Sequence, residues 1–308
     1  EHYMPLFSIA DTQLIVYGAP GTGKSYGIND TLSSLGFDLT NEVERVVFHK
    51  DYTYSDFIGC LMPNNGATGL DYIFEPGPFT IALEKALESP KAKICLLIEE
   101  MNRGNCGEIF GDIFQLLDRD ASGKSSYTIM NEDIKKYLEL NPATLPALSA
   151  WGIGEADIFI PSNLYIIGTM NTADQNVFVM DSAFKRRFKM RYAPIVFDLA
   201  EPHLAKLNSL SQSTLFAGTR TWSEFATEVN SLIDRINTDM VSISEDKKLG
   251  PYFVDEVDVS CKQAFCDKVI YYLKNDVFKY VDLVFYNSYE AIYEEIVNND
   301  GDIFDCLK

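Results

Sequence analysis

The feature that most constrains this chain is a glycine-rich turn between an apolar strand and a predicted helix. The turn consists of Gly18, Ala19, Pro20, Gly21, Thr22, Gly23, Lys24 and Ser25. It fits the pattern G-x-x-x-x-G-K-[ST] at every position. Apolar residues at 13–17 predict the strand, and the helix is expected over 23–35. A strand, a turn of this kind and a helix in that order favour an α/β fold with a parallel sheet.

The residue types in this turn suit the phosphates of a nucleotide. Glycine at 21 and 23 lets the backbone bend so that successive N–H groups point at phosphate oxygens, and the following helix adds its positive end. Lys24 is expected to reach the β- and γ-phosphates, and the hydroxyl of Ser25 is expected to ligate Mg²⁺. We therefore predict that all eight residues of the turn bind a nucleoside triphosphate.

Two adjacent carboxylates end a second apolar strand, which is predicted at 94–98. We expect Glu99 to hold Mg²⁺ through water, and Glu100 to orient and activate the attacking water. Aspartate is the more usual residue at the first position. The extra methylene of Glu99 moves the carboxylate by roughly 1 Å, which a water-mediated contact absorbs. The alternative is a solvated strand end that carries two acids.

A third apolar strand, predicted at 164–168, leads into Met170, Asn171, Thr172, Ala173 and Asp174. An asparagine and an aspartate at the tip of a central strand can reach the γ-phosphate and its attacking water. Asn171 and Asp174 are therefore candidate catalytic residues.

Three consecutive cations, Lys185, Arg186 and Arg187, follow Asp181 and a short helical stretch. A guanidinium inserted across a subunit interface would stabilise charge on the γ-phosphoryl group in the transition state. Arg186 and Arg187 are the candidates for this role. The alternative is a basic surface patch.

Four other positions complete the set of candidates. Arg103 either faces the nucleotide of a neighbouring subunit or pairs with one of the two glutamates. Lys247 and Lys248 either present a cation to the phosphates or belong to a solvated loop. His49 lies among aromatic residues and is expected to be a satisfied core residue and not a ligand.

The composition of the chain limits the kinds of partner that it can bind. The net charge is −19, from 45 acidic and 26 basic residues, so the surface repels nucleic acid unless cations are concentrated in a groove or pore. No apolar run approaches the ~18 residues that span a membrane.

The six cysteines form no C-x-x-C pair and the three histidines are scattered, which argues against zinc and for free thiols in the cytoplasm. Because the chain opens with Glu1, we expect a fragment or a processed form.

The pattern changes near residue 197. Strands alternate with helices over 1–197, with one further helix expected at 109–117 and a partly ordered insertion at about 121–157 that holds a helical patch at 133–140. Residues 198–308 are mostly helical, with helices expected at 222–236, 262–273 and 289–297. A short extended piece is expected at 252–254.

Taken together, these motifs resemble the McrB family of AAA+ NTPases, the motor subunits of modification-dependent (type IV) restriction systems. The phosphate-binding turn is similar to that of the family. Residues 47–57, VFHKDYTYSDF, look like its F-H-x-x-Y-x-Y-x-D-F segment, and 98–105, IEEMNRGN, resemble D-E-I-N-R-A-N. Residues 170–174 match its M-N-T-A-D signature, and 181–188 are similar to D-x-A-x-R-R-R-F.

The resemblance implies an AAA+ core at 1–197 with a parallel sheet flanked by helices, and a helical lid at 198–308. It also implies a hexameric ring of identical subunits, GTP as the nucleotide, Mg²⁺, and an McrC-like nuclease partner. On that pattern Asn171 is the sensor, Asp174 helps to position water, and Arg186 and Arg187 act in a neighbouring subunit. DNA would be contacted through another domain or the assembled complex, and no membrane is expected.

Two positions depart from the family pattern: Gln175 stands in place of arginine, and Glu99 in place of aspartate. Some LlaJI-like members of the family carry both changes, so the chain resembles that divergent branch. Two other classes of function stay open. One is an ATP-dependent remodelling chaperone of the MoxR kind, and the other is a nucleotide-gated scaffold that does not hydrolyse.

Overall fold

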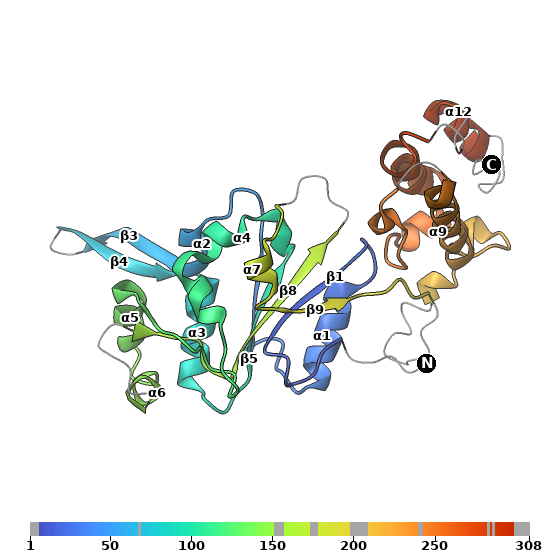
Figure 1. Ribbon diagram of the computed structural model, residues 1–308. Coiled ribbons are helices and arrows are strands. Elements are labelled where there is room, and N and C mark those ends of the chain that lie inside the picture. Colours follow the sequence, from blue (N-terminus) through green and yellow to red (C-terminus); the bar gives the residue numbers. More distant parts are fainter. Residues whose placement is uncertain are drawn as a thin grey trace.

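The computed structural model describes residues 6–66, 69–150, 157–172, 178–197, 209–239, 243–281, 284 and 287–298. Its centre is a sheet of five strands in the order β2-β5-β8-β1-β9. Figure 1 labels four of them, β5, β8, β1 and β9. These strands are β1 (Gln13–Gly18), β2 (Val43–Val47), β5 (Ile94–Glu99), β8 (Leu164–Asn171) and β9 (Lys189–Tyr192). Every neighbouring pair is parallel, which confirms the predicted α/β class.

The register of the sheet brings the ends of three strands together. Gly18 pairs with Asn171, and Ile98 pairs with Gly168. Because parallel strands all point the same way, the carboxyl ends of β1, β8 and β5 lie at one edge. With strands about 4.8 Å apart, the ends of β1 and β5 are separated by roughly 10 Å across β8.

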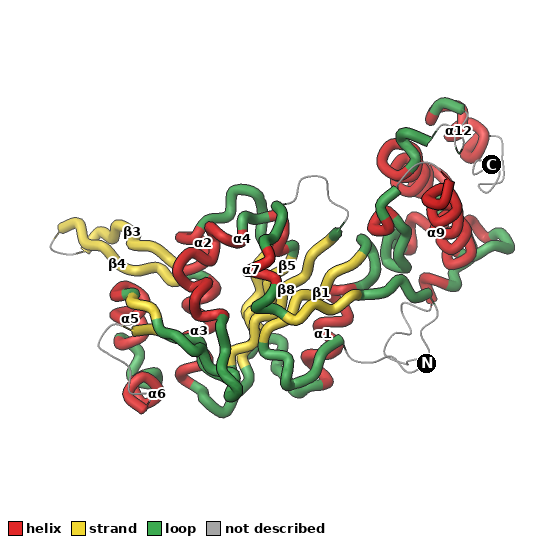
Figure 2. The backbone as a smooth tube through the Cα atoms, in the orientation of Figure 1, coloured by secondary structure: helices red, strands yellow, loops and turns green. Residues whose placement is uncertain are grey.

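Helices cover both faces of this sheet (Figures 1 and 2). Successive side chains of a strand point to opposite faces. Leu14 and Leu97 accordingly pack with Ile28 of α1 (Lys24–Ser34), whereas Ile98 packs with Leu83 of α3 (Pro78–Glu88) in a second buried cluster. The strands read as continuous apolar runs because both of their faces are buried.

The helix expected at 109–117 is in fact two segments. α4 (Cys106–Phe110) ends at Gly111, which adopts φ +48°, and a 3-10 segment follows over Gly111–Leu117. Both halves keep their apolar residues in the same buried cluster. The helical spacing was therefore correct, and the break at Gly111 was missed because one glycine inside a helical pattern does not by itself predict a break.

A two-stranded hairpin and a small subdomain flank the sheet. α2 (Tyr54–Ile58) leads into the antiparallel pair β3 (Gly59–Gly66) and β4 (Gly69–Pro76), which extends away from the sheet in Figure 1. The segment expected to be a partly ordered insertion contains β6 (Ile129–Met130), α5 (Glu132–Glu139), α6 (Leu145–Ala150) and β7 (Asp157–Ile158). Ile134 and Leu138 of α5 belong to the main buried cluster, so this segment is part of the core.

The C-terminal part of the described chain is helical, as expected, and has a buried cluster of its own around Trp222 and Phe265. Its elements are α9 (Trp222–Asp239), α10 (Glu256–Ser260), α11 (Lys262–Phe265) and α12 (Tyr289–Tyr293), with π-helical segments at Cys266–Ile270, Leu273–Val277 and Glu294–Asn298 and 3-10 turns at Leu215–Ala217 and Glu245–Lys247. The extended piece expected at 252–254 is wrong, because these residues form a turn.

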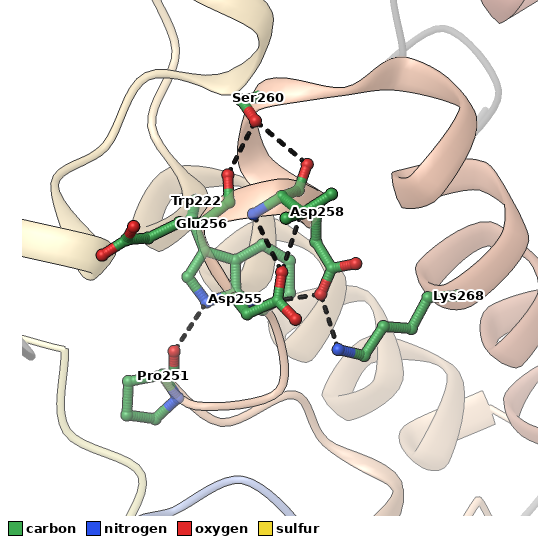
Figure 3. A network of polar contacts seen from close by, with 8 residues as sticks. Trp222, Pro251, Asp255, Glu256, Asp258, Ser260 and Lys268 are labelled. Carbon is green, nitrogen blue, oxygen red and sulfur yellow. Dashed lines mark hydrogen bonds and ion pairs between the residues drawn. The ribbon is translucent and has the colours of Figure 1, made fainter.

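This turn is held from both sides. The indole Nε1 of Trp222 donates to the Pro251 carbonyl at 3.2 Å, and Asp255 caps α10 by accepting from the N–H groups of Val257 and Asp258 (Figure 3). The Asp258 carboxylate accepts from the Asp255 N–H in return and pairs with Lys268.

None of the helices in the described ranges combines the length and the hydropathy that a bilayer crossing requires.

Candidate functional site

The glycine-rich turn lies between β1 and α1, as its sequence predicts. Gly21 and Gly23 adopt φ +72° and +81°, a left-handed conformation that glycine takes at little cost. The Lys24 ammonium lies beneath the turn and donates to the carbonyls of Gly18 at 3.1 Å and Ala19 at 2.8 Å. Lys24 is 8% exposed, whereas Ser25 is exposed on the first turn of α1. The turn therefore offers backbone donors, a cation and a hydroxyl at the carboxyl edge of the sheet.

Glu100 has the most constrained conformation at this edge. It follows β5 with φ +53° and ψ +42°, a left-handed conformation that is uncommon for a residue other than glycine. Its N–H donates to Thr169 Oγ1 at 3.2 Å. Its Oε1 accepts from the Nδ2 of Asn171 at 2.6 Å. The side chains of Glu100 and Asn171, two candidate catalytic residues 71 positions apart in sequence, are thus hydrogen-bonded to each other.

Arg103 completes this group. Its Nε lies 3.2 Å from Glu100 Oε2, so of the two interpretations the structure places it in a pair with a glutamate of its own chain. Asn102 Nδ2 donates to the Asn171 carbonyl at 2.7 Å and fixes the end of β8. The sequence motif contains Asn102, but nothing in the pattern reveals this contact, because it depends on the neighbouring strand.

Glu99 lies beside Glu100 but is held by different residues. Its Oε1 is 2.5 Å from Arg45 Nη1, and Arg45 Nη2 donates to Asn29 Oδ1 at 2.5 Å. Arg45 comes from β2 and Asn29 from α1. Both were missed by sequence reasoning, which considered only the residues inside the motifs.

Arg186 and Arg187 lie at the other edge of the sheet. They follow α7 (Ser182–Lys185) and precede β9, whose register pairs Lys189 with Leu14 near the start of β1. The 6 residues of β1 separate that edge from the glycine-rich turn by about 17 Å. Neither arginine therefore reaches the glycine-rich turn of its own chain.

The two arginines have different surroundings. Arg187 Nη2 is 2.6 Å from Asp118 Oδ2, its Nη1 donates to the Ala183 carbonyl, and its guanidinium stacks over Phe114 at 4.0 Å. Arg186 is exposed and makes no side-chain hydrogen bond or ion pair within the described part of the chain. Asp174 and Gln175 lie outside the described residues.

The helical part reaches the glycine-rich turn through a tyrosine, not a lysine. The Tyr252 N–H donates to the Gly21 carbonyl at 2.8 Å, and a Cβ at Gly23 would overlap the Tyr252 ring. Lys247 donates to the Asp276 carbonyl, and Lys248 pairs with Asp234 at 2.7 Å. The expectation that one of these lysines faces the phosphates therefore has no support in the geometry.

His49 and its neighbours have a structural role. His49 is exposed and packs edge-on against Tyr52, so the expectation of a core histidine is wrong. Thr53 and Asp56 cap α2 reciprocally, and the Thr53 hydroxyl lowers the pKa of Asp56 by donating to its carboxylate. Burial and the nearby Asp56 raise the pKa of Tyr52 to about 12. The role of this segment is therefore to position α2.

Comparison with known proteins agrees with this arrangement. The family described as "AAA domain (dynein-related subfamily)" matches residues 13–188. The component YdiS of the type II restriction enzyme BsuMI from Bacillus subtilis (strain 168) is 34% identical over 327 residues, which cover 97% of this chain and 89% of that protein. The EcoKMcrB subunit of a type IV methyl-directed restriction enzyme from Escherichia coli (strain K12) is 31% identical over 183 residues, 57% of this chain and 34% of that protein.

A crystal structure of a protein from Cytophaga hutchinsonii aligns over 74% of this chain and 62% of its own, with a TM-score of 0.38 and 14% identity, a likeness too weak to support a conclusion. The sheet order and the glycine-rich turn define a P-loop NTPase of the AAA+ class. Within that class, the chain belongs to the AAA domain (dynein-related subfamily) family and is an McrB-like member of it.

Proposed function

We propose that this chain is a Mg²⁺-dependent nucleoside triphosphatase, with GTP as the favoured nucleotide, that forms the ring-shaped motor of a restriction or phage-defence complex. The observation that carries the proposal is the Glu100–Asn171 pair, held beside the phosphate-binding turn at one edge of the sheet. The relatives named as restriction-enzyme components support the biological setting. In this proposal residues 1–197 are the AAA+ core and 198–308 the lid.

The chemistry is hydrolysis of the γ-phosphate by water. Asn171 and Glu100 orient the water, and the Glu100 carboxylate accepts its proton as the water oxygen attacks phosphorus and the bond to the β-phosphate oxygen breaks. Lys24 and the backbone N–H groups of 18–25 hold the phosphates. Asp174 is proposed to help position the same water.

The metal would be held by Ser25 and Glu99. The Ser25 hydroxyl is exposed at the start of α1 and the Glu99 carboxylate ends β5, and oxygen atoms of these two kinds are the ligands that Mg²⁺ prefers. Bound Mg²⁺ neutralises charge on the phosphate oxygens. The oxygen donors of the chain therefore fit the ion.

The finger that completes the site is proposed to come from a neighbouring subunit. The edge-to-edge distance of about 17 Å along β1 prevents either arginine from acting in its own chain. Arg186 is the first candidate because its guanidinium is exposed, whereas Arg187 is bound to Asp118. A closed ring, proposed to be a hexamer, supplies each site with one such neighbour.

An McrC-like nuclease subunit is the proposed partner, and DNA is proposed to be contacted by another domain or by the assembled complex. The net charge of −19 supports this division of labour, because an acidic surface repels DNA. One observation favours the non-hydrolysing scaffold as a second candidate. Both glutamates at the strand end pair with arginines of the same chain, which withholds them from metal and water.

Hydrolysis of GTP and ATP, measured side by side with Mg²⁺ at concentrations that allow assembly, tests the proposal. Lys24→Ala serves as the blank. We expect GTP to be hydrolysed faster than ATP. Preference for ATP would favour a remodelling chaperone of the MoxR kind, and tight binding without turnover, even with the nuclease partner present, would favour the scaffold.

A further inference from the structure

The carboxylate proposed to face Mg²⁺ is engaged by a cation of its own chain. Arg45 Nη1 lies 2.5 Å from Glu99 Oε1, and the other end of the guanidinium binds Asn29 Oδ1. Val47 of β2 pairs with Glu99 of β5, so Arg45 lies two residues back on the same side of the neighbouring strand. The guanidinium therefore bridges the end of β5 and the helix that follows the phosphate-binding turn.

This bridge lies next to both residues proposed to hold the metal. Ser25 and Asn29 are four residues apart on α1 and so share one face of the helix. Glu99 is bound directly. An ion placed between the Ser25 hydroxyl and the Glu99 carboxylate would thus share its carboxylate with Arg45.

The side-chain length of Glu99 matters for this contact. An aspartate at position 99 would be one methylene shorter, and its carboxylate would fall short of Arg45 by roughly 1 Å. The glutamate that departs from the usual residue is therefore the one that makes this ion pair. An isolated surface ion pair contributes little to stability, and the Arg45 side chain is 39% exposed. A role in the site accounts for the arrangement better than a role in folding.

Resting on the proposed function, we propose that Arg45 is a positioning residue that competes with Mg²⁺ for Glu99 and thereby sets the Mg²⁺ concentration at which nucleotide binds. The guanidinium neutralises the carboxylate and repels a second cation nearby. Mg²⁺ must therefore share the Glu99 carboxylate with the guanidinium or displace the guanidinium from it. Asn29 holds the guanidinium in place, so the competition is built into the framework of β2 and α1.

Binding of a fluorescent GTP analogue, titrated with Mg²⁺ at equilibrium, tests this without turnover. We expect Arg45→Gln to lower the Mg²⁺ midpoint by about three- to tenfold, the range for removal of one partly exposed charge near a cation. Arg45→Lys keeps the charge and should stay close to wild type. Lys85→Gln is the matched control, because it removes one cation that pairs with Glu44, also on β2, and does not touch Glu99.

A second comparison isolates Glu99. In a Glu99→Gln background a neutral amide replaces the carboxylate, so Arg45→Gln should shift the Mg²⁺ midpoint much less. The inference is overturned if Arg45→Gln behaves like Lys85→Gln, if it raises the midpoint, or if its full effect persists without the Glu99 charge. If wild type binds no nucleotide at any Mg²⁺ concentration while remaining folded, the proposed function itself fails.

Discussion

Glu100 has an uncommon backbone conformation at the point where the proposed chemistry takes place. Its left-handed φ and ψ cost of order 1 kcal/mol for a residue with a side chain, and the N–H contact to Thr169 and the Asn171 contact hold it there. In this conformation the carboxylate contacts Asn171 at the end of β8. A residue that served only to end the strand would not need this arrangement.

Replacing Glu100 by glutamine tests its role as the base. We expect Glu100→Gln to bind nucleotide as wild type does, because the amide keeps the shape, and to lose turnover by about 100-fold or more, because it accepts no proton. Equilibrium binding and single-turnover hydrolysis measure the two properties separately. Full hydrolysis by this variant would remove Glu100 from the mechanism.

At this scale the sequence predicts the residues that end central strands. Glu100 and Asn171 could be foreseen together because parallel strands finish at one edge of a sheet. The different surroundings of Arg186 and Arg187 could not be foreseen. Arg187 looks equivalent to Arg186 in sequence, and only the structure shows that its side chain is largely buried against Asp118 and Phe114.

Among the elements, α10 shows how a short helix is fixed next to the turn that contacts the phosphate loop. Asp255 accepts from two backbone N–H groups at the start of α10, and the Trp222 contact to Pro251 holds the preceding residues (Figure 3). The Asp258 N–H, burial and the Lys268 charge act on Asp255, and their net effect is to lower its pKa. The cap therefore depends on the ionised carboxylate.

Asp255→Ala should destabilise the helical part by about 1 kcal/mol, the usual contribution of an N-cap. Because the folded pKa is lowered, this contribution is present above the unfolded pKa of roughly 4 and is lost as the pH falls through the lower folded pKa. Urea denaturation at pH 7 and pH 3 measures the difference. Glu256→Ala, which removes the neighbouring carboxylate, is the control. An equal loss of unfolding free energy in both variants at pH 7 would rule out the capping role.

The elements themselves were largely predictable. Strands at 13–17, 94–98 and 164–168 stand out as apolar runs because both of their faces are buried. β9 was missed because it has only four residues, all exposed at the edge of the sheet, and its sequence KMRY contains no continuous apolar run. The aromatic residues at 252–254 suggested an extended piece. In the structure they form a turn, and they pack against the phosphate loop and the helical cluster instead of in a sheet.

For the molecule as a whole, the main consequence is that the two halves of the proposed site lie at opposite edges of the sheet of one chain. The phosphate-binding turn and Glu100 lie at the carboxyl edge, and Arg186 lies beyond the other. Sequence order alone could not reveal this separation, because it follows from the register of β9 on β1. In the proposed function each half therefore acts with the complementary half of a second copy of the chain.

Mixing two inactive variants tests that claim most directly. Glu100→Gln supplies Arg186 but no base, and Arg186→Ala supplies the base but no finger. Each alone should be nearly inactive, whereas an equal mixture should regain up to roughly a quarter of wild-type turnover, since half of the sites keep Glu100 and half of those meet an intact Arg186 in a heterologous ring. A mixture that co-assembles by light scattering yet stays inactive, or full activity of Arg186→Ala alone, would contradict the account.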